Sequence, residues 1–186
     1  MPKPLTPFAQ RFSPALLAQA QGVRIVFLDV DGVLTDGGLH FTEHGETIKR
    51  FNTLDGHGIK LLQKAGIVVA VVTGRDSAPL RLRLQQLGVQ HVVYGTEDKV
   101  PAAQSILDQL GLVWSQAAAM GDDWPDLPVM QRCAFACAPC NAHGENLGMA
   151  DFVTTVAGGH GAVRQLCDLL LIANGQYASL LEAYQR

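Results

Sequence analysis

The sequence lacks a long apolar run, and it also lacks a long run of one charge. No apolar stretch approaches the roughly 20 residues needed to cross a bilayer. The first twenty residues contain prolines but no continuous apolar core of a signal peptide. The 14 Lys and Arg residues against 17 Asp and Glu give a net charge of −3. We therefore expect a cytoplasmic protein with neither a membrane nor a nucleic acid as its partner.

Cysteine is scarce, and its four positions do not follow the spacing of a known metal site. Cys133, Cys137 and Cys140 lie close together, whereas Cys167 falls in a Leu-rich segment that reads as a helix. This pattern matches neither a zinc nor an iron–sulfur site. We therefore interpret the cysteines as small, mostly buried residues in a reducing compartment.

What the sequence does contain is a regular alternation of strand-like and helix-like segments. Its 186 residues, 48% of them hydrophobic, suffice for one domain with its own core. The predicted strands are residues 24–30, 67–72, 91–94, 117–120, 134–137 and 152–154. The predicted helices are residues 54–65, 77–87, 98–110, 125–132 and 161–173. This order is typical of an α/β fold with a doubly wound, Rossmann-like parallel sheet.

One segment interrupts the alternation, and it suggests how the chain is organised. Residues 37–53 contain two short β-type runs around a Gly-containing turn, which predicts a β-hairpin inserted after the first strand. The remaining intervals are too short for a separate cap domain. We expect an N-terminal extension (1–23), a catalytic-type domain (24–173) and a C-terminal tail (174–186).

Polar residues follow several predicted strands, at the point where each strand ends. The stretch IVFLDVDGVLTDGG leads from a buried strand into Asp29 and Asp31, and VVTGR places Thr73 after the next strand. Asp122 follows a third strand in AAAMGDDWPD, and Lys99 begins a helix in DKVPA. Because ligands of open α/β sheets bind at the carboxyl ends of the strands, we expect these five side chains to meet.

This set of side chains suits phosphoryl transfer. Clustered carboxylates repel one another unless a hard cation such as Mg²⁺ lies among them. An Asp carboxylate can attack phosphorus to form an aspartyl phosphate, and Lys and hydroxyl groups can neutralise the phosphoryl oxygens. A second carboxyl group can protonate the leaving alkoxide and then activate water.

Each of these features is weak alone, so two other classes of protein remain open. A receiver-type signalling module also carries clustered Asp, Thr and Lys residues on a doubly wound sheet, but Asp31 would have no role in it. A non-catalytic protein that binds a partner through the hairpin would leave the whole acid set unexplained. A receiver would accumulate phospho-aspartate, whereas an enzyme would turn over a small sugar phosphate.

The motifs DVDGVLTDGG, VVTGR, DKVPA and MGDDWPDLPVM resemble the four motifs of the haloacid dehalogenase-like phosphohydrolases. The resemblance implies that Asp29 is the nucleophile and Asp31 the general acid/base, whose backbone carbonyl also binds Mg²⁺. It implies that Asp29 and Asp122 are the other metal ligands and that Thr73 and Lys99 hold the phosphoryl oxygens. We interpret Asp123 and Asp126 as helix-start and supporting residues rather than metal ligands.

A narrower resemblance, to a capless branch of that family, rests on FNTLDGHGIKLL, TGRDSAPLRLRLQQLGV and AGGHGAVRQLCDLLL. This branch hydrolyses 3-deoxy-D-manno-octulosonate 8-phosphate (KDO 8-phosphate) in lipopolysaccharide precursor synthesis. The implied substrate contacts, besides Asp31 and Lys99, are Asn52, Thr53, Leu54, Asp55, Gly56, Arg75 and Arg83. The nine-carbon analogue remains an alternative substrate, because His57, Trp124 and Cys140 depart from the usual pattern of this branch.

The missing cap domain leads to an expectation about assembly. Without a lid, the site is open to water, and an isolated two-stranded hairpin needs a surface to pack on. The resemblance implies a homotetramer in which the hairpins pair and each site is walled by a neighbour. We expect residues 38–52 at the interface and a mobile tail after Asn174, including Tyr177, Tyr184 and Arg186.

Overall fold

The computed structural model of the chain describes residues 11–185 and confirms the α/β class. Six strands form one parallel sheet in the order β5–β4–β1–β6–β7–β8. They are β1 (Ile25–Leu28), β4 (Val68–Val72), β5 (His91–Val93), β6 (Ala117–Met120), β7 (Phe135–Ala138) and β8 (Phe152–Val153). Each overlaps a strand predicted from the sequence.

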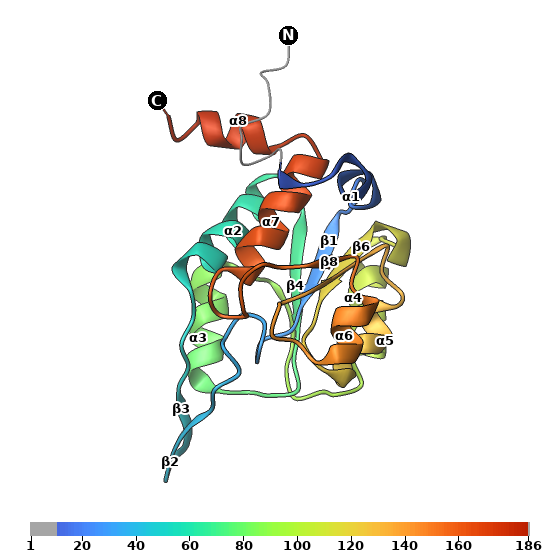
Figure 1. Cartoon of the computed structure of the whole chain (residues 1–186). Helices are drawn as coiled ribbons and strands as arrows, with labels where there is room; N and C mark the ends of the chain where they lie inside the picture. The colour runs from blue at the N-terminus through green and yellow to red at the C-terminus, as the bar shows by residue number, and fades with distance from the viewer. Residues whose placement is uncertain (1–10, 186) are drawn as a thin grey trace.

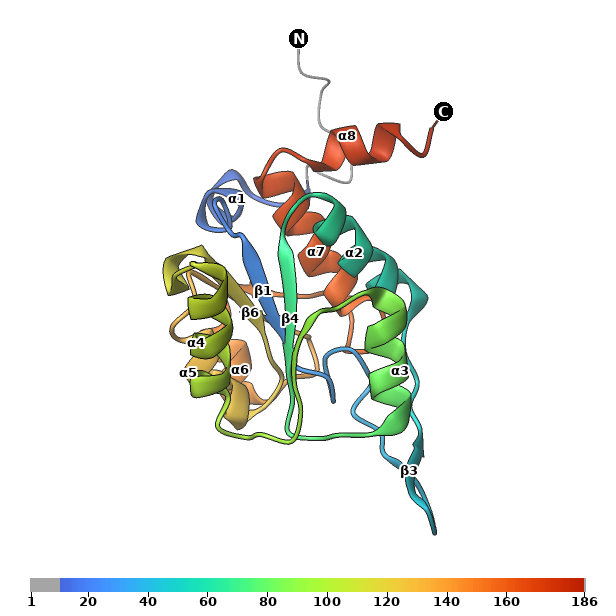
Figure 2. The same cartoon turned by 180° about the vertical axis from the view of Figure 1, so that it is seen from behind.

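Helices cover both faces of this sheet (Figures 1 and 2). One layer contains α1 (Pro14–Gln19), α2 (Thr53–Lys64), α3 (Ala78–Leu87) and α7 (Ala162–Ala173), with α8 (Tyr177–Glu182) packed on α7. The other contains α4 (Lys99–Leu110), α5 (Leu127–Met130) and α6 (Gly144–Met149). In β1, Val26 and Leu28 join the first core and Ile25 and Phe27 the second, which explains why every residue of this strand is apolar.

The predicted hairpin is present and projects away from the body of the molecule (Figures 1 and 2). It consists of antiparallel strands β2 (His40–Thr42) and β3 (Gly45–Ile48). Phe41 and Ile48 are 62% and 61% exposed, so the hairpin carries apolar side chains that nothing in the described chain covers. Between β1 and β4 the chain holds only this hairpin and α2, and no cap domain.

Three helices were not predicted, and one of them corrects an expectation about the tail. Helix α6 has the sequence GENLGM, whose two glycines disfavour a helix. Helix α8 lies in the tail that was expected to be mobile, but its Leu180 is 9% exposed and the Tyr184 ring lies 5.5 Å from His57. The tail therefore packs on the domain, where its side chains contact α2 and α7. Arg186 and residues 1–10 lie outside the described residues.

No described helix has the length and hydropathy required to cross a bilayer. The predicted extension is ordered from residue 11, with Ser13 capping α1 and Pro14 at the first helical position. Helix α1 packs against α7 and thereby belongs to the first core rather than to a separate unit.

The strand register places three predicted site residues at one edge. Leu28 pairs with Val71 of β4 and with Met120 of β6, so the residues that follow these strands reach the same level. The chain builds the sheet outward from β1 through β4 to β5 and then returns to the other side of β1 at β6. The change of direction opens a crevice between the ends of β1 and β6, where ligands bind in such folds.

Candidate active site

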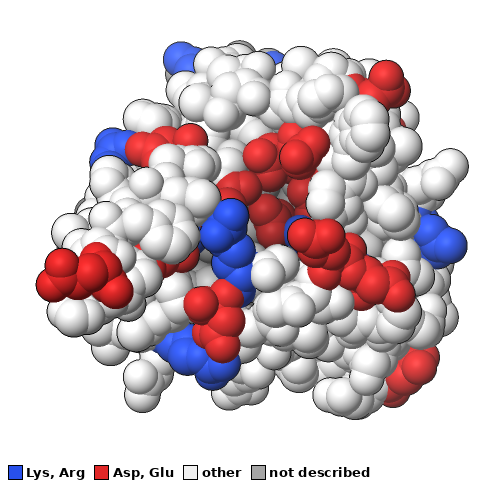
Figure 3. All heavy atoms as spheres, turned by 90° about the horizontal axis from the view of Figure 1, so that it is seen from below, with Lys and Arg blue, Asp and Glu red and all other residues white. Residues whose placement is uncertain are grey.

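A hollow of about 550 Å³ opens at this edge of the sheet. Its lining includes all five residues predicted to act on phosphate or metal, namely Asp29, Asp31, Thr73, Lys99 and Asp122. Figure 3 looks onto this edge and shows acidic side chains gathered in the hollow with basic side chains beside them. The fold therefore brings together residues from four separate segments of the chain.

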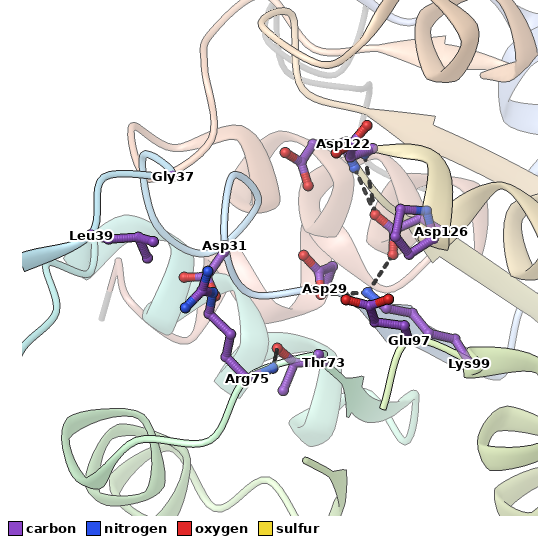
Figure 4. Close-up of a pocket in the computed structure, with 13 residues that line it drawn as sticks. Asp29, Asp31, Gly37, Leu39, Thr73, Arg75, Glu97, Lys99, Asp122 and Asp126 are labelled. Carbon is purple, nitrogen blue, oxygen red and sulfur yellow. Dashed lines mark hydrogen bonds and ion pairs between the residues drawn. The ribbon is translucent and has the colours of Figure 1, made fainter. Parts of the chain in front are cut away.

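Lys99 places its ammonium group between the carboxylates of Asp29 and Asp126 (Figure 4). Its ammonium Nζ is 2.6 Å from Asp29 Oδ1 and 2.6 Å from Asp126 Oδ1. Burial alone would lower the pKa of Lys99, but the adjacent carboxylates of Asp29 and Asp126 outweigh it and raise the pKa. Lys99 therefore remains a cation and directs a fixed positive charge at the nucleophile candidate.

Asp126 supports both Lys99 and the loop that carries Asp122. Its second oxygen accepts hydrogen bonds from the backbone N–H groups of Asp122 (3.0 Å) and Asp123 (3.4 Å). Asp123 accepts a bond from the N–H of Trp124 (2.8 Å), at the start of the short turn η3 (Trp124–Asp126). Both oxygens of Asp126 thus have partners within the chain, as expected of a supporting residue, although its carboxylate also belongs to the acidic group described next.

The carboxylates form a set that fits a hard divalent cation. Asp29, Asp122 and Asp126 each offer an oxygen within 4.8 Å of the others, the only such group of Asp, Glu, His or Cys side chains within residues 11–185. Burial first, and then the neighbouring carboxylates, raises the pKa of Asp122 to about 7. Burial and Asp126 also raise the pKa of Asp29. One ammonium does not balance this charge, so the donor set suits Mg²⁺.

A glycine makes room for the carboxylate of Asp122. Gly32 has a left-handed φ of +88°, and a Cβ added there would lie 2.0 Å from Asp122 Oδ2. The glycine of the DGV stretch therefore serves two needs, because it permits the turn after β1 and lets two segments approach closely. Sequence reasoning did not identify this role.

Asp31 points toward basic side chains rather than toward Lys99. Its Oδ1 forms an ion pair with Lys49, and its Oδ2 lies 3.7 Å from Arg75 Nε. Thr73 extends the β4 ladder by donating its N–H to Val93, and its Oγ1 accepts a bond from the N–H of Arg75. Lys49, which leaves the hairpin after β3, was missed by the sequence analysis because no motif marks it.

The predicted substrate contacts divide into two places. Arg75 lines the acidic hollow, but Asn52–Gly56 and Arg83 do not. Thr53, Gly56 and Arg83 line a separate hollow of about 210 Å³ beside the start of α2. Gly56 has no side chain there because a Cβ would lie 2.3 Å from Arg83 Nη2.

Two of these predicted contacts have structural partners within the chain. Asp55 is 1% exposed and accepts hydrogen bonds from the N–H groups of Gly161 (3.2 Å) and Arg164 (2.8 Å). It thereby holds the start of α7, so its side chain does not reach the acidic hollow. Asn52 caps α2 by accepting a bond from the N–H of Leu54 (2.8 Å). The sequence showed which residues are acidic, but not which of them are engaged in structural hydrogen bonds within the fold.

Magnesium is expected to raise the melting temperature of the metal-free protein. A ligand at 100 times its Kd stabilises by about 2.7 kcal/mol, which corresponds to roughly 5–10 °C for a domain of this size. Because burial raises the carboxyl pKa values above the ordinary 3.8, ionisation destabilises the metal-free fold as the pH rises toward 7. At acidic pH, Mg²⁺ must displace bound protons, so the gain should be larger at about pH 8 than at about pH 5.5.

Differential scanning fluorimetry of the wild type and Asp122→Asn, with and without Mg²⁺, checks this expectation. The variant should lose most of the gain, since it lacks one of the three carboxylates of the acidic group. An equal gain in both proteins would show that Mg²⁺ binds elsewhere.

Comparisons with known proteins complete the description of the site. The chain is 40% identical to 3-deoxy-D-manno-octulosonate 8-phosphate phosphatase KdsC of Salmonella typhimurium over 164 residues, 88% of this chain and 87% of that protein. A crystal structure of 3-deoxy-D-manno-octulosonate 8-phosphate phosphatase from Moraxella catarrhalis is also similar, with a TM-score of 0.89 and 32% identity. The match covers 93% of this chain and 99% of that chain, and that structure is in complex with magnesium ion, phosphate ion and KDO. A cobalt-bound deoxy-D-mannose-octulosonate 8-phosphate phosphatase from Haemophilus influenzae matches with a TM-score of 0.86 and 38% identity, covering 90% and 99%. No protein-family model matches the chain.

Proposed function

The chain belongs to the KDO 8-phosphate phosphatase family of haloacid dehalogenase-like phosphohydrolases, and we propose that it hydrolyses KDO 8-phosphate to the free sugar acid and phosphate with Mg²⁺. The observation that carries this function is the meeting of Asp29, Asp31, Lys99 and Asp122 in one hollow. The bound magnesium, phosphate and KDO named for the Moraxella relative support the same ligands here.

Asp29 performs the first half of the reaction. Its carboxylate attacks phosphorus as the sugar oxygen departs, which leaves an aspartyl phosphate. Lys99 and Thr73 hold the phosphoryl oxygens and neutralise their charge. Asp29 and Asp122, with the backbone carbonyl of Asp31, would hold Mg²⁺, which supplies further charge neutralisation when bound.

Asp31 supplies the protons. Its carboxyl group gives a proton to the leaving sugar alkoxide, which is a poor leaving group without one. The resulting carboxylate then takes a proton from the water that attacks the aspartyl phosphate. The second step releases phosphate and restores both carboxyl groups to their starting states.

A phosphate-release screen with Mg²⁺ tests the function. The panel contains KDO 8-phosphate, its nine-carbon keto-deoxy analogue, and simple sugar phosphates that lack a carboxylate. We expect the largest kcat/KM for KDO 8-phosphate. Preference for the nine-carbon ester would assign the alternative substrate, and stable phospho-aspartate without turnover would assign a receiver-type module.

The exposed hairpin supports a proposed homotetramer. Phe41 and Ile48 are both more than half exposed, and Leu39 is 41% exposed beside the acidic hollow. A second copy of the chain would cover these apolar side chains and shield a site that has no cap of its own. We also propose that the enzyme works in the cytoplasm, where it catalyses one step of lipopolysaccharide precursor synthesis.

Assembly would also give a role to Arg83, one of the predicted substrate contacts outside the acidic hollow. Asn52–Gly56 and Arg83 lie outside the hollow of their own chain, and the Arg83 Nε is buried without a hydrogen-bond partner among the described residues. Placed against a neighbour, the arginine would face that neighbour's substrate. We therefore assign Arg75 to the chain's own site and Arg83 to the adjacent one, where each binds the sugar acid.

Complementation between inactive subunits is the expected consequence. Asp29→Asn lacks the nucleophile but keeps Arg83, whereas Arg83→Ala keeps the nucleophile. Mixed oligomers from co-expression of the two should recover part of the kcat/KM for KDO 8-phosphate, because some sites then combine an intact Asp29 with an intact Arg83. Activity in the mixture no higher than the sum of the separate variants, or a fully active monomer by sedimentation, would contradict the assignment.

A further inference from the structure

Lys49 is a fully buried cation in contact with the general acid/base. Its side chain has 0% exposure, and its ammonium forms ion pairs with Asp31 Oδ1 and, at 2.8 Å, with Glu46 Oε1. Asp31 lines the acidic hollow, whereas Lys49 does not. The ammonium therefore contacts Asp31 from outside the lining of the hollow.

The surroundings of Asp31 show what this contact does. The side chain of Asp31 is 20% exposed and lines the hollow. Arg75, whose side chain is 47% exposed, is its other basic neighbour, at the longer distance of 3.7 Å. Lys49 is thus the one buried side chain in the described chain that forms an ion pair with Asp31, and it fixes one of the two carboxyl oxygens.

Packing alone does not require a charge at this position. Removing a lysine ammonium from water is costly, and an apolar side chain of similar volume often stabilises a fold as well as a buried ion pair does. The charge has a specific consequence here, because it holds the carboxyl group that must meet the leaving oxygen. A displacement of about 1 Å at such a group can cost on the order of 10²-fold in rate.

Resting on the proposed function, we infer that Lys49 is a positioning residue that holds Asp31 Oδ1 so that the other oxygen exchanges protons with the leaving group. Lys49 does not touch substrate and transfers no proton. Because it belongs to the segment that leaves the hairpin, it also links the hairpin to the catalytic acid.

The inference predicts that loss of Lys49 affects esters according to their leaving group. In Lys49→Met, kcat/KM for KDO 8-phosphate should fall about 10- to 100-fold, within the range that general acid catalysis contributes. A simple alkyl ester, glycerol phosphate, should fall by a similar factor because it also releases an alkoxide. The kcat/KM for p-nitrophenyl phosphate should change less than about 3-fold, because p-nitrophenolate departs without a proton.

The choice of kcat/KM isolates the relevant step. This constant covers binding and transfer up to departure of the leaving group, so the later attack of water on the aspartyl phosphate does not enter it. The aryl ester serves as the internal control, since misfolding or dissociation of subunits would lower all three values together. Activity of the wild type on the same esters tests the proposed function separately.

Each outcome decides the inference. A fall in kcat/KM confined to KDO 8-phosphate would show that Lys49 contacts the sugar. An equal fall for all three esters would show a structural role. Either result would overturn the inference. The double variant Lys49→Met/Glu46→Gln removes the carboxylate left unpaired by the single change. Retention of the leaving-group dependence in the double variant supports positioning of Asp31, and its disappearance would assign the effect to the unpaired Glu46.

Discussion

Asp29→Asn is expected to lower hydrolysis of KDO 8-phosphate by about 10³-fold or more, because the amide cannot form the covalent phosphoryl intermediate. Asp122 and Asp126 lie beside it, but we assign Asp122 to the metal, and Asp126 is engaged by Lys99 and by two backbone N–H groups. Phosphate release under single-turnover conditions, with acid-quench detection of the phosphoprotein, measures both the rate and the intermediate.

The same variant provides its own check of folding. The substitution removes a buried carboxylate whose pKa is raised chiefly by burial, so the metal-free protein should melt no lower than the wild type near neutral pH. Near-normal turnover, or a phosphoprotein still formed by Asp29→Asn, would refute the mechanism. A lower melting temperature would instead show that Asp29 stabilises the fold through Lys99.

Lys99→Met is expected to separate catalysis from metal binding. Lys99 is the one cation within 2.6 Å of Asp29 among the described residues, and removal of a preorganised group that stabilises developing charge costs about 10²- to 10³-fold in kcat. Binding of Mg²⁺ should not weaken, because the variant removes a positive charge beside the carboxylates that we propose as the Mg²⁺ site. Steady-state kinetics and titration calorimetry with Mg²⁺ measure the two quantities.

A surface lysine supplies the matched control for this experiment. Lys64 is exposed at the end of α2, where its ammonium lies 6.0 Å from the centre of the Tyr184 ring. Lys64→Met should leave kcat and the affinity for Mg²⁺ unchanged. Weaker Mg²⁺ binding in Lys99→Met with kcat preserved would contradict the role assigned to Lys99 and identify it as a support of the metal site only.

The sequence by itself determined the layers of the fold and the chemistry of the site. Strands buried on both faces must be continuously apolar, so β1 and β4 were visible as runs. The helices predicted to end at residues 87 and 110 do end there, where Gly88 and Gly111 adopt the left-handed conformation. A parallel sheet also collects its strand ends at one edge, which made the meeting of Asp29, Thr73 and Asp122 predictable from their positions alone.

Only the tertiary structure decided which polar residues are free for function. Asp55 and Asp126 carry the same functional group as Asp122, but the first holds the start of α7 and the second holds Lys99 and a loop. Lys49 carries no motif, yet the return of the chain from the hairpin places it against Asp31. Local patterns record which groups a chain carries, whereas their partners depend on contacts between distant segments, which have no periodicity along the sequence.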